Sequence, residues 1–225
     1  MKKILIIGGT KGIGEALANM LKSTHHVITI SRSQVTPQQN IQHHSLNILE
    51  DDLPEIQDLD GLVYCPGSIN LKSLTQLTLD DFQNDFNINV LGAIKTIKKY
   101  EKALSKNNGS VVLFSTVATQ LGMPFHASVS VSKAGIEGLA KSLAAEYATK
   151  IRFNVIAPTV TNTTLAARLL RNDKQKEIMK ERHPLKNYLE ATEVASLANY
   201  LLSDDAKAIS GQVFPIDAGI VSLKI

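Results

Sequence analysis

Short apolar runs alternate with longer stretches of helical periodicity along this chain. The apolar runs predict strands at 3–7, 26–30, 41–46, 61–65, 110–114, 152–157 and 212–215. The periodic stretches predict helices over 13–22, 79–106, 127–149 and 192–202, with a shorter one over 165–182. Strands that are apolar throughout are typical of a sheet covered on both faces. Because strands and helices alternate, we expect one doubly wound α/β domain with a parallel sheet of about seven strands.

Size and charge narrow the possible classes of protein. A chain of 225 residues with 44% hydrophobic and 20% charged residues suits a single globular domain spanning 1–225. The net charge of +3 is too small to indicate a nucleic-acid partner, and the first apolar run, "ILII", is too short for export or for a bilayer span. The lone Cys65 excludes an intrachain disulfide. We therefore expect a cytoplasmic protein with no nucleic-acid partner, no membrane partner and no metal site.

The stretch "ILIIGGTKGIGEALANML" carries the strongest chemical signal. Gly8 allows a tight turn after the first strand, Gly12 lets the backbone approach a pyrophosphate, and Gly14 permits close packing of helix on strand. Free amides and the dipole at the helix start then favour a phosphate. A plain glycine-rich turn is the alternative, but the position at the head of an alternating chain favours a Rossmann-type dinucleotide site. Thr10, Lys11 and Ile13 complete the predicted turn.

The residues that end the second strand indicate which of the two nicotinamide dinucleotides to expect. An acidic residue there would bind the ribose hydroxyls and repel an additional phosphate. This strand ends "VITISRS", with Ser31 at that position and Arg32 after it, and Lys11 within reach. Two cations without a carboxylate favour a 2′-phosphate and therefore NADP(H). The alternative, two ordinary surface cations, does not explain why they flank the same point.

Several segments together resemble the short-chain dehydrogenase/reductase family. They are the glycine turn, "LVYCPGS", "FNINVLGA", "VVLFSTVATQLGMPFHASVSVSKAGIEGLAKSLAAEYA", "IRFNVIAPTVTNTTL" and "GQVFPIDAG". The resemblance covers almost the whole chain and implies a nicotinamide-dependent oxidoreductase acting on a small carbonyl or alcohol. It implies catalytic roles for Asn89, Thr116 and Lys133. It also implies cofactor contacts by Asn47, Gly67, Asn89, Lys133, Pro158 and Thr163.

The resemblance fails at one position that matters for catalysis. The family's proton-donating tyrosine stands four residues before its lysine, and here that position is Val129. A valine supplies no proton, and general acid–base assistance is typically worth ~10²–10⁴ in rate. Ser128 and Ser130 flank Val129, but one residue along a helix turns the side chain by about 100°. His126 is a further candidate donor, although an ordinary position at the helix start is the simpler interpretation.

Two functions fit this pattern. One is an NADP(H)-dependent oxidoreductase with an altered proton donor, and the other is a catalytically impaired NADP(H)-binding sensor or assembly protein. Retention of Asn89, Thr116 and Lys133 together favours the oxidoreductase. Segment 159–190, polar and rich in Lys and Arg, is expected to cover the small-molecule substrate as a lid. The family resemblance implies a homodimer or homotetramer built on the helices predicted at 79–106 and 127–149.

Overall fold

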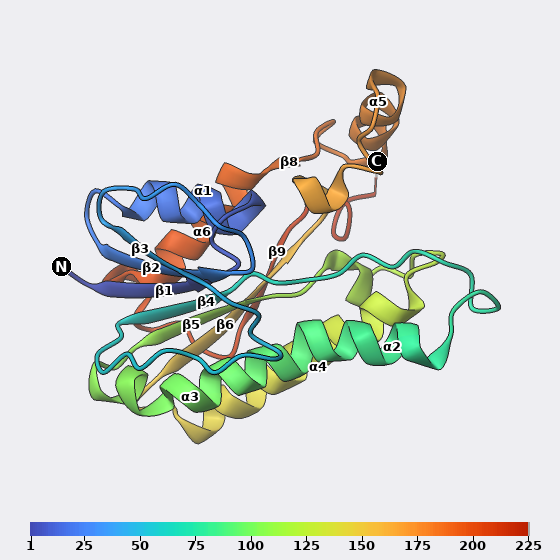
Figure 1. The fold of residues 1–225 in the computed structure, drawn as a ribbon. Coiled ribbons are helices and arrows are strands. Elements are labelled where there is room, and N and C mark those ends of the chain that lie inside the picture. The colour runs from blue at the N-terminus through green and yellow to red at the C-terminus, as the bar shows by residue number, and fades with distance from the viewer. Residues whose placement is uncertain (225) are drawn as a thin grey trace.

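The computed structural model describes residues 1–224 and is built around one parallel sheet (Figure 1). Its seven strands run in the order β3-β2-β1-β4-β5-β6-β9, and every neighbouring pair is parallel. The strands are β1 (Lys3–Ile7), β2 (His26–Ser31), β3 (Ile41–Ser45), β4 (Gly61–Tyr64), β5 (Ser110–Phe114), β6 (Arg152–Pro158) and β9 (Val213–Ile216). The strand order reverses between β1 and β4, so the predicted doubly wound sheet is confirmed.

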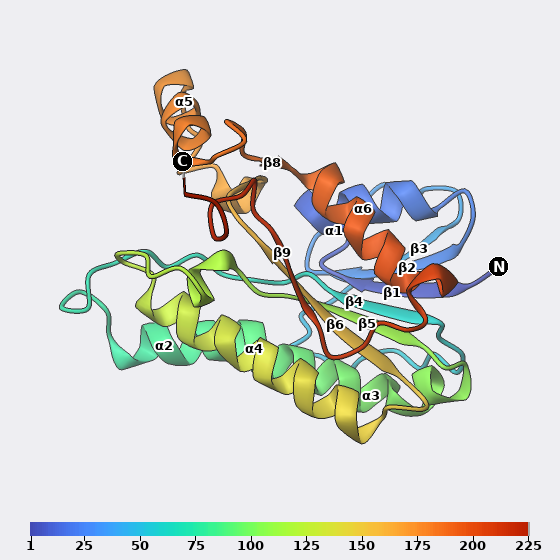
Figure 2. The ribbon, with the colours of Figure 1, turned by 180° about the vertical axis from the view of Figure 1, so that it is seen from behind.

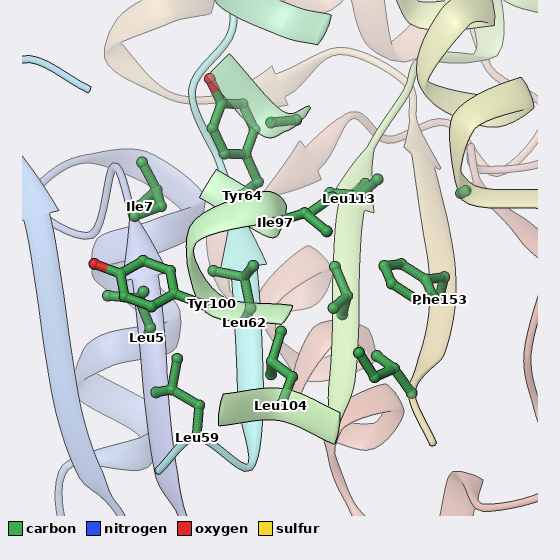
Figure 3. Close-up of a cluster of buried hydrophobic side chains, with 14 of the residues drawn as sticks. Leu5, Ile7, Leu59, Leu62, Tyr64, Ile97, Tyr100, Leu104, Leu113 and Phe153 are labelled. Carbon is green, nitrogen blue, oxygen red and sulfur yellow. The ribbon is translucent and has the colours of Figure 1, made fainter. Parts of the chain in front are cut away.

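Helices cover both faces of the sheet (Figures 1 and 2). One face carries α1 (Gly12–Leu21) and α6 (Ala191–Leu202), and the other carries α2 (Leu79–Phe86), α3 (Gly92–Lys106) and α4 (Ala127–Glu146). Each face has its own apolar cluster. Figure 3 shows the first, in which Tyr100 and Leu104 of α3 lie over Leu5 of β1 and Leu62 of β4. Burial on both faces explains why the strands read as continuous apolar runs.

The helix expected over 79–106 is interrupted by a π-helical turn. This turn, Asn87–Leu91, separates α2 from α3. Thr78 caps α2, because its side chain accepts from the Asp81 amide while the Asp81 carboxylate accepts from the Thr78 amide. Single π turns inside helices often occur at functional sites. This one contains Asn89, for which the family resemblance predicts a catalytic role.

Segment 159–190 is less helical than its sequence predicts. A short 3₁₀ turn (Thr164–Ala166) is followed by irregular chain, and α5 spans only Asp173–Arg182, without a buried residue. The small strands β7 (Thr161–Asn162) and β8 (Leu189–Glu190) pair with each other and were not anticipated. Figure 2 shows α5 standing away from the sheet beside the C-terminal segment.

Both edges of the sheet carry residues that disfavour further pairing. The outer strand β3 reads IQHHS and is only partly buried. Its His43 bonds through Nδ1 to Thr29 Oγ1 and through Nε2 to the carbonyl oxygen of Ser33. The opposite outer strand, β9, contains Pro215, which has no amide hydrogen to donate. Neither edge is therefore a long, flat row of free donors and acceptors.

Candidate active site

A cleft of about 360 Å³ opens at the carboxyl ends of β1, β2 and β4. Ligands of doubly wound sheets bind at this position, beyond the point where the strand order reverses. The predicted cofactor residues that line this cleft are Gly8, Thr10, Lys11, Gly12, Ile13, Gly14, Ser31, Arg32, Asn47, Gly67 and Thr163. No aspartate or glutamate belongs to its wall, among the residues that the structure describes.

The glycine turn has the geometry that its sequence predicts. Gly8 and Gly12 have φ of +77° and +56°, in the region that favours glycine. A Cβ on Gly14 would lie 2.4 Å from the carbonyl oxygen of Gly8, so a side chain there collides with backbone. The first turn of α1 therefore lies directly against the end of β1. Its free amides face the cleft, which suits a phosphate.

Replacing Gly14 with alanine should weaken dinucleotide binding by at least about tenfold and destabilise the fold by about 1–3 kcal/mol, as overpacking does. The reason is that α1 has to move away from β1, and the phosphate cradle moves with it. Isothermal titration with NADPH and urea unfolding measure the two effects. Gly138→Ala is the matched control, because no atom lies within 4 Å of its added Cβ, and it should change neither binding nor stability adversely. Unchanged affinity in Gly14→Ala would show that the turn does not hold the dinucleotide.

The end of β2 presents positive charge and hydroxyl groups. Thr10 Oγ1 donates to Ser31 Oγ at 2.9 Å, which ties the glycine turn to β2. Lys11 and Arg32 are both exposed and both line the cleft. Asn47 also lines it, but its Oδ1 accepts from the Leu49 amide at 3.2 Å. Two cations therefore stand beside one end of the cleft, as the sequence indicated.

A second cavity of about 220 Å³ adjoins the first and is open to a small molecule. Gly67, Cys65 and Thr163 line both spaces, so the two are direct neighbours. The predicted residues Thr116, Lys133 and Pro158 line the second cavity. Thr164 and Leu165 border the cleft, while Leu165, Met179 and Arg182 border the second cavity, so segment 159–190 forms one wall of this site.

Lys133 is the buried cation of this second cavity. Its side chain extends from α4, is 8% exposed, and donates from Nζ to the carbonyl oxygen of Phe114 at 2.9 Å. Burial lowers the pKa of this ammonium group to about 8, and the nearby Cys65 and Asp85 oppose that shift. Burial also raises the pKa of the Cys65 thiol to about 12, so the thiol is neutral near pH 7. Lys133 is therefore mainly a positive donor near neutral pH.

Asn89 lies beneath Gly67, next to Lys133. A Cβ built on Gly67 would lie 3.4 Å from both Asn89 Oδ1 and Lys133 Nζ, so this glycine makes room for both groups. Asn89 is 1% exposed and donates from Nδ2 to Ser68 Oγ at 3.0 Å and to the carbonyl oxygen of Asp85 at 2.7 Å. Its Oδ1 has no hydrogen-bond partner among residues 1–224. A buried acceptor without a partner indicates a place for water or ligand.

Asp85, which sequence reasoning missed, organises this region from α2. Its buried carboxylate accepts from the hydroxyls of both Ser68 and Ser128. The bond from Ser128 orients that hydroxyl toward α2, and Ser128 is absent from the described wall of the second cavity. Ser130 Oγ donates to the carbonyl oxygen of Ala118. Neither serine beside Val129 therefore offers its proton to the cavity.

The other side chains near the expected proton donor lie either in the wall of the second cavity or in the core. Thr116 lines the second cavity, and its Oγ1 accepts from the Ala118 amide at 3.3 Å. Val129 is buried and lines the same cavity. His126 also lines it and is only partly buried, and its Nδ1 donates to the carbonyl oxygen of Pro124. Tyr64 is buried, and its hydroxyl donates to the carbonyl oxygen of Ile88 at 2.6 Å.

A hydroxyl–imidazole pair that sequence reasoning missed completes the second cavity. Thr159 Oγ1 and His183 Nε2 are 2.7 Å apart, and both residues line this cavity. Thr159 directly follows β6, and His183 follows α5. Within residues 1–224, no group of three or more His, Cys, Asp or Glu side chains is arranged to hold a metal ion.

The sheet, the glycine turn and the paired cavities together define a nucleotide-binding α/β domain of the kind that oxidoreductases use. The family model described as "Enoyl-(Acyl carrier protein) reductase" matches residues 35–221. The chain belongs to the short-chain dehydrogenase/reductase family and is an oxidoreductase. It is 26% identical over 230 residues to the 3-oxoacyl-[acyl-carrier-protein] reductase MabA of Mycobacterium tuberculosis, covering 97% of this chain and 92% of that protein.

Other relatives and solved structures extend the comparison. A peroxisomal 2,4-dienoyl-CoA reductase of Saccharomyces cerevisiae is 26% identical, over 94% of this chain and 71% of that protein. The structure of ElxO with NADP bound has a TM-score of 0.86 and 27% identity, and covers 99% of both chains. A 4-hydroxyisoleucine dehydrogenase complexed with NADH has a TM-score of 0.90 at 24% identity, with 100% of both chains covered, which shows the shared fold. The ElxO structure, at 27% identity, supports a nicotinamide cofactor for this chain.

Proposed function

We propose that this protein is an NADP(H)-dependent oxidoreductase that transfers a hydride to or from a small carbonyl or alcohol, with an altered proton donor. The observation that carries the proposal is that the two cavities adjoin and share Gly67 and Thr163 in their walls. The first cavity suits a dinucleotide bound at the glycine turn. Thr116 and Lys133 line the second cavity, which adjoins it. The bound cofactor supplies the hydride.

The cofactor preference is inferred from charge. Lys11 and Arg32 flank the end of β2, and no carboxylate lines the cleft in the described part of the chain. A 2′-phosphate placed there meets two cations, whereas a carboxylate would have repelled it. The structure of ElxO with NADP bound supports the same assignment by similarity.

The chain's own residues take the following roles in this proposal. Lys133 binds the nicotinamide ribose through its ammonium group, and Thr116 donates to the substrate oxygen. Asn89 holds a water through its unpartnered Oδ1. Pro158 and Thr163 border the position of the nicotinamide, while Asn47 borders that of the adenine. The side chain of Val129 fills the position of the family's tyrosine and donates no proton.

Exchanging Arg32 for aspartate should reverse or abolish a preference for NADPH over NADH. The change removes a charge-assisted contact to the phosphate and adds a repulsive one, so NADPH affinity should fall by at least about tenfold. Fluorescence titration with both cofactors measures the ratio. Arg171→Asp is the control, because this exposed arginine lies outside both cavities and its loss makes the same change in net charge. Equal wild-type titration curves for NADPH and NADH would refute the phosphate assignment.

A second candidate function is a catalytically impaired NADP(H)-binding sensor or assembly protein. Val129 favours it, because no phenol accompanies Lys133. The two candidates separate in one assay, in which a panel of carbonyl compounds is offered to the NADPH-loaded protein. Oxidation of NADPH with matching formation of alcohol supports the oxidoreductase. Tight NADPH binding without turnover on any panel member supports the sensor.

The assembly and location are also proposed. Phe86 of α2, Leu91 of the π turn and Val131 of α4 are exposed apolar side chains on one helical layer. Together with the family resemblance, they support a homodimer or homotetramer in which these helices meet. No helix within residues 1–224 is both long and apolar enough to cross a membrane. We infer a cytoplasmic single-domain protein in which segment 159–190 covers a small-molecule substrate.

A further inference from the structure

The pair formed by Thr159 and His183 lies where a proton could enter the reaction. His183 is 1% exposed and Thr159 is 8% exposed, so water does not compete freely for their bond. Their 2.7 Å separation is that of a good hydrogen bond. A threonine and a histidine that are both buried and both line one cavity form the usual arrangement of a hydroxyl activated by a base.

The partners of the imidazole ring determine the direction of this bond. His183 Nδ1 lies 2.6 Å from the carbonyl oxygen of Met179, which can only accept a hydrogen bond. Nδ1 therefore carries a hydrogen, and in the neutral ring Nε2 is an acceptor for the Thr159 hydroxyl. In the protonated ring Nε2 donates instead, which frees the threonine hydrogen for another acceptor. The Met179 carbonyl holds the ring orientation in both states.

The backbone places this pair beside the predicted catalytic threonine. Phe114 of β5 pairs with Ile156 of β6 in the parallel register. Two residues further along the neighbouring strands come Thr116 and Pro158, and Thr159 follows directly. Thr116 and Thr159 therefore leave adjacent strand ends, and both line the second cavity. Val129 lines this cavity too, so the pair borders the space that lacks a phenol.

We propose that Thr159, recharged by His183, supplies the proton in place of the missing phenol. This inference rests on the proposed oxidoreductase function. In the reduction direction, hydride from NADPH forms a C–H bond at the carbonyl carbon, and the C=O π electrons move to oxygen. That oxygen takes the Thr159 Oγ1 hydrogen, while Thr159 takes the Nε2 hydrogen of protonated His183. The products are the alcohol, NADP⁺ and neutral His183, which regains its proton from solvent when the lid segment opens.

The tautomer of His183 tests the arrangement without catalysis. In ¹⁵N NMR of the imidazole at high pH, the neutral ring should carry its hydrogen on Nδ1, with Nε2 as acceptor. Thr159→Val keeps the shape of the side chain and should move the Nε2 signal, while Thr159→Ser should leave it close to that of the wild type. A neutral ring protonated on Nε2 overturns the proposal, because such a ring cannot accept from Thr159.

Kinetics test the role in proton transfer. With a panel substrate that the wild type reduces, Thr159→Val should lower kcat by about 10²-fold, within the range for general acid–base assistance, and leave the NADPH Kd unchanged. Thr159→Ser should restore most of the rate. His26→Gln is the control, since His26 is exposed at the start of β2 and lines neither cavity, and it should keep the wild-type rate. Wild-type turnover by Thr159→Val overturns the proposal.

The rate of a His183 variant, measured across pH, distinguishes the role of His183 from that of the neighbouring ionisable groups. The other ionisable groups on the cavity wall are Lys133, Arg182, His126 and Cys65. Because the proposed transfer uses the Nε2 hydrogen, His183→Gln should lower the rate of reduction at every pH, while a limb from Lys133 near pH 8 remains. A wild-type profile in His183→Gln overturns the proposal. Failure of the wild type to bind NADPH or to reduce any panel carbonyl is a different result and overturns the oxidoreductase function itself.

Discussion

Val129→Tyr should raise the rate of carbonyl reduction by about tenfold or more, within the ~10²–10⁴ that general acid–base assistance provides. The new phenol lies four residues before Lys133 on α4, so the two side chains share one face of the helix. Val129 already lines the second cavity of about 220 Å³, into which the ring would extend. The buried ammonium group beside it favours the phenolate and makes the phenol a better acid.

The gain should depend on whether another donor is present. If Thr159 supplies the proton, the added tyrosine improves an existing route, and its effect should be larger in the Thr159→Val background. Steady-state kinetics of the two single variants and the double variant measure that coupling. Val129→Phe is the matched control, because it adds the ring without the hydroxyl and should not raise the rate. A rate unchanged by Val129→Tyr would mean that this position does not face the reacting oxygen.

Lys133→Met should lower kcat/KM by about 10²-fold or more, the usual cost of removing a preorganised donor from a reacting site. Methionine keeps the length of the side chain and its fit among apolar neighbours, but it cannot donate to the Phe114 carbonyl or to a ribose. NADPH affinity should fall together with the rate. Lys141→Met on the same helix is the control, since Lys141 is exposed.

The same variant should change how stability depends on pH. The folded pKa of Lys133, about 8, lies below the unfolded value of 10.5, so the unfolded chain binds more protons between these values. The free energy of unfolding therefore rises with pH in this window, by roughly 1 kcal/mol between pH 8 and 9, and is lowest below pH 8. Cys65, with its pKa raised from 9.0 to about 12, acts in the opposite direction above pH 9 in both proteins.

Urea unfolding of the cofactor-free protein at pH 7.5, 8.2 and 9 measures this slope. The free energy of unfolding of the wild type should rise relative to that of Lys133→Met across the series. Only the wild type has a buried ammonium group, and losing its proton removes the cost of burying that charge. Parallel curves for the two proteins would show that Lys133 keeps its proton in the folded state over this range.

The sheet was predictable because burial on both faces leaves a local signal. Strands such as β5 are apolar at almost every position, and their predicted bounds agree with the structure within one or two residues. The π turn at Asn87–Leu91 has no such signal, since five residues are too few to reveal a change of period. The start of α5, in contrast, does carry a local sequence signal. Asn172 caps the helix by accepting from the Gln175 amide, and an Asn-Asp pair is typical of helix starts.

Some features of the candidate site can likewise be read from local sequence, and others cannot. Glycine spacing and the charges at Lys11 and Arg32 can be read from residues close in sequence, and these residues line one cleft. Thr159 and His183 are 24 residues apart and join only because α5 and β6 end beside the same cavity. Asp85 is likewise defined by its contacts with Ser68 and Ser128, which come from separate segments. Pairings of this kind require the tertiary structure.

The composition of the two outermost strands has a consequence for the behaviour of the native protein at high concentration. A foreign strand arriving beside β9 meets the pyrrolidine ring of Pro215, and one arriving beside β3 meets a short, partly buried strand of mostly polar residues, IQHHS. The native sheet is thus a poor template for cross-β polymerisation.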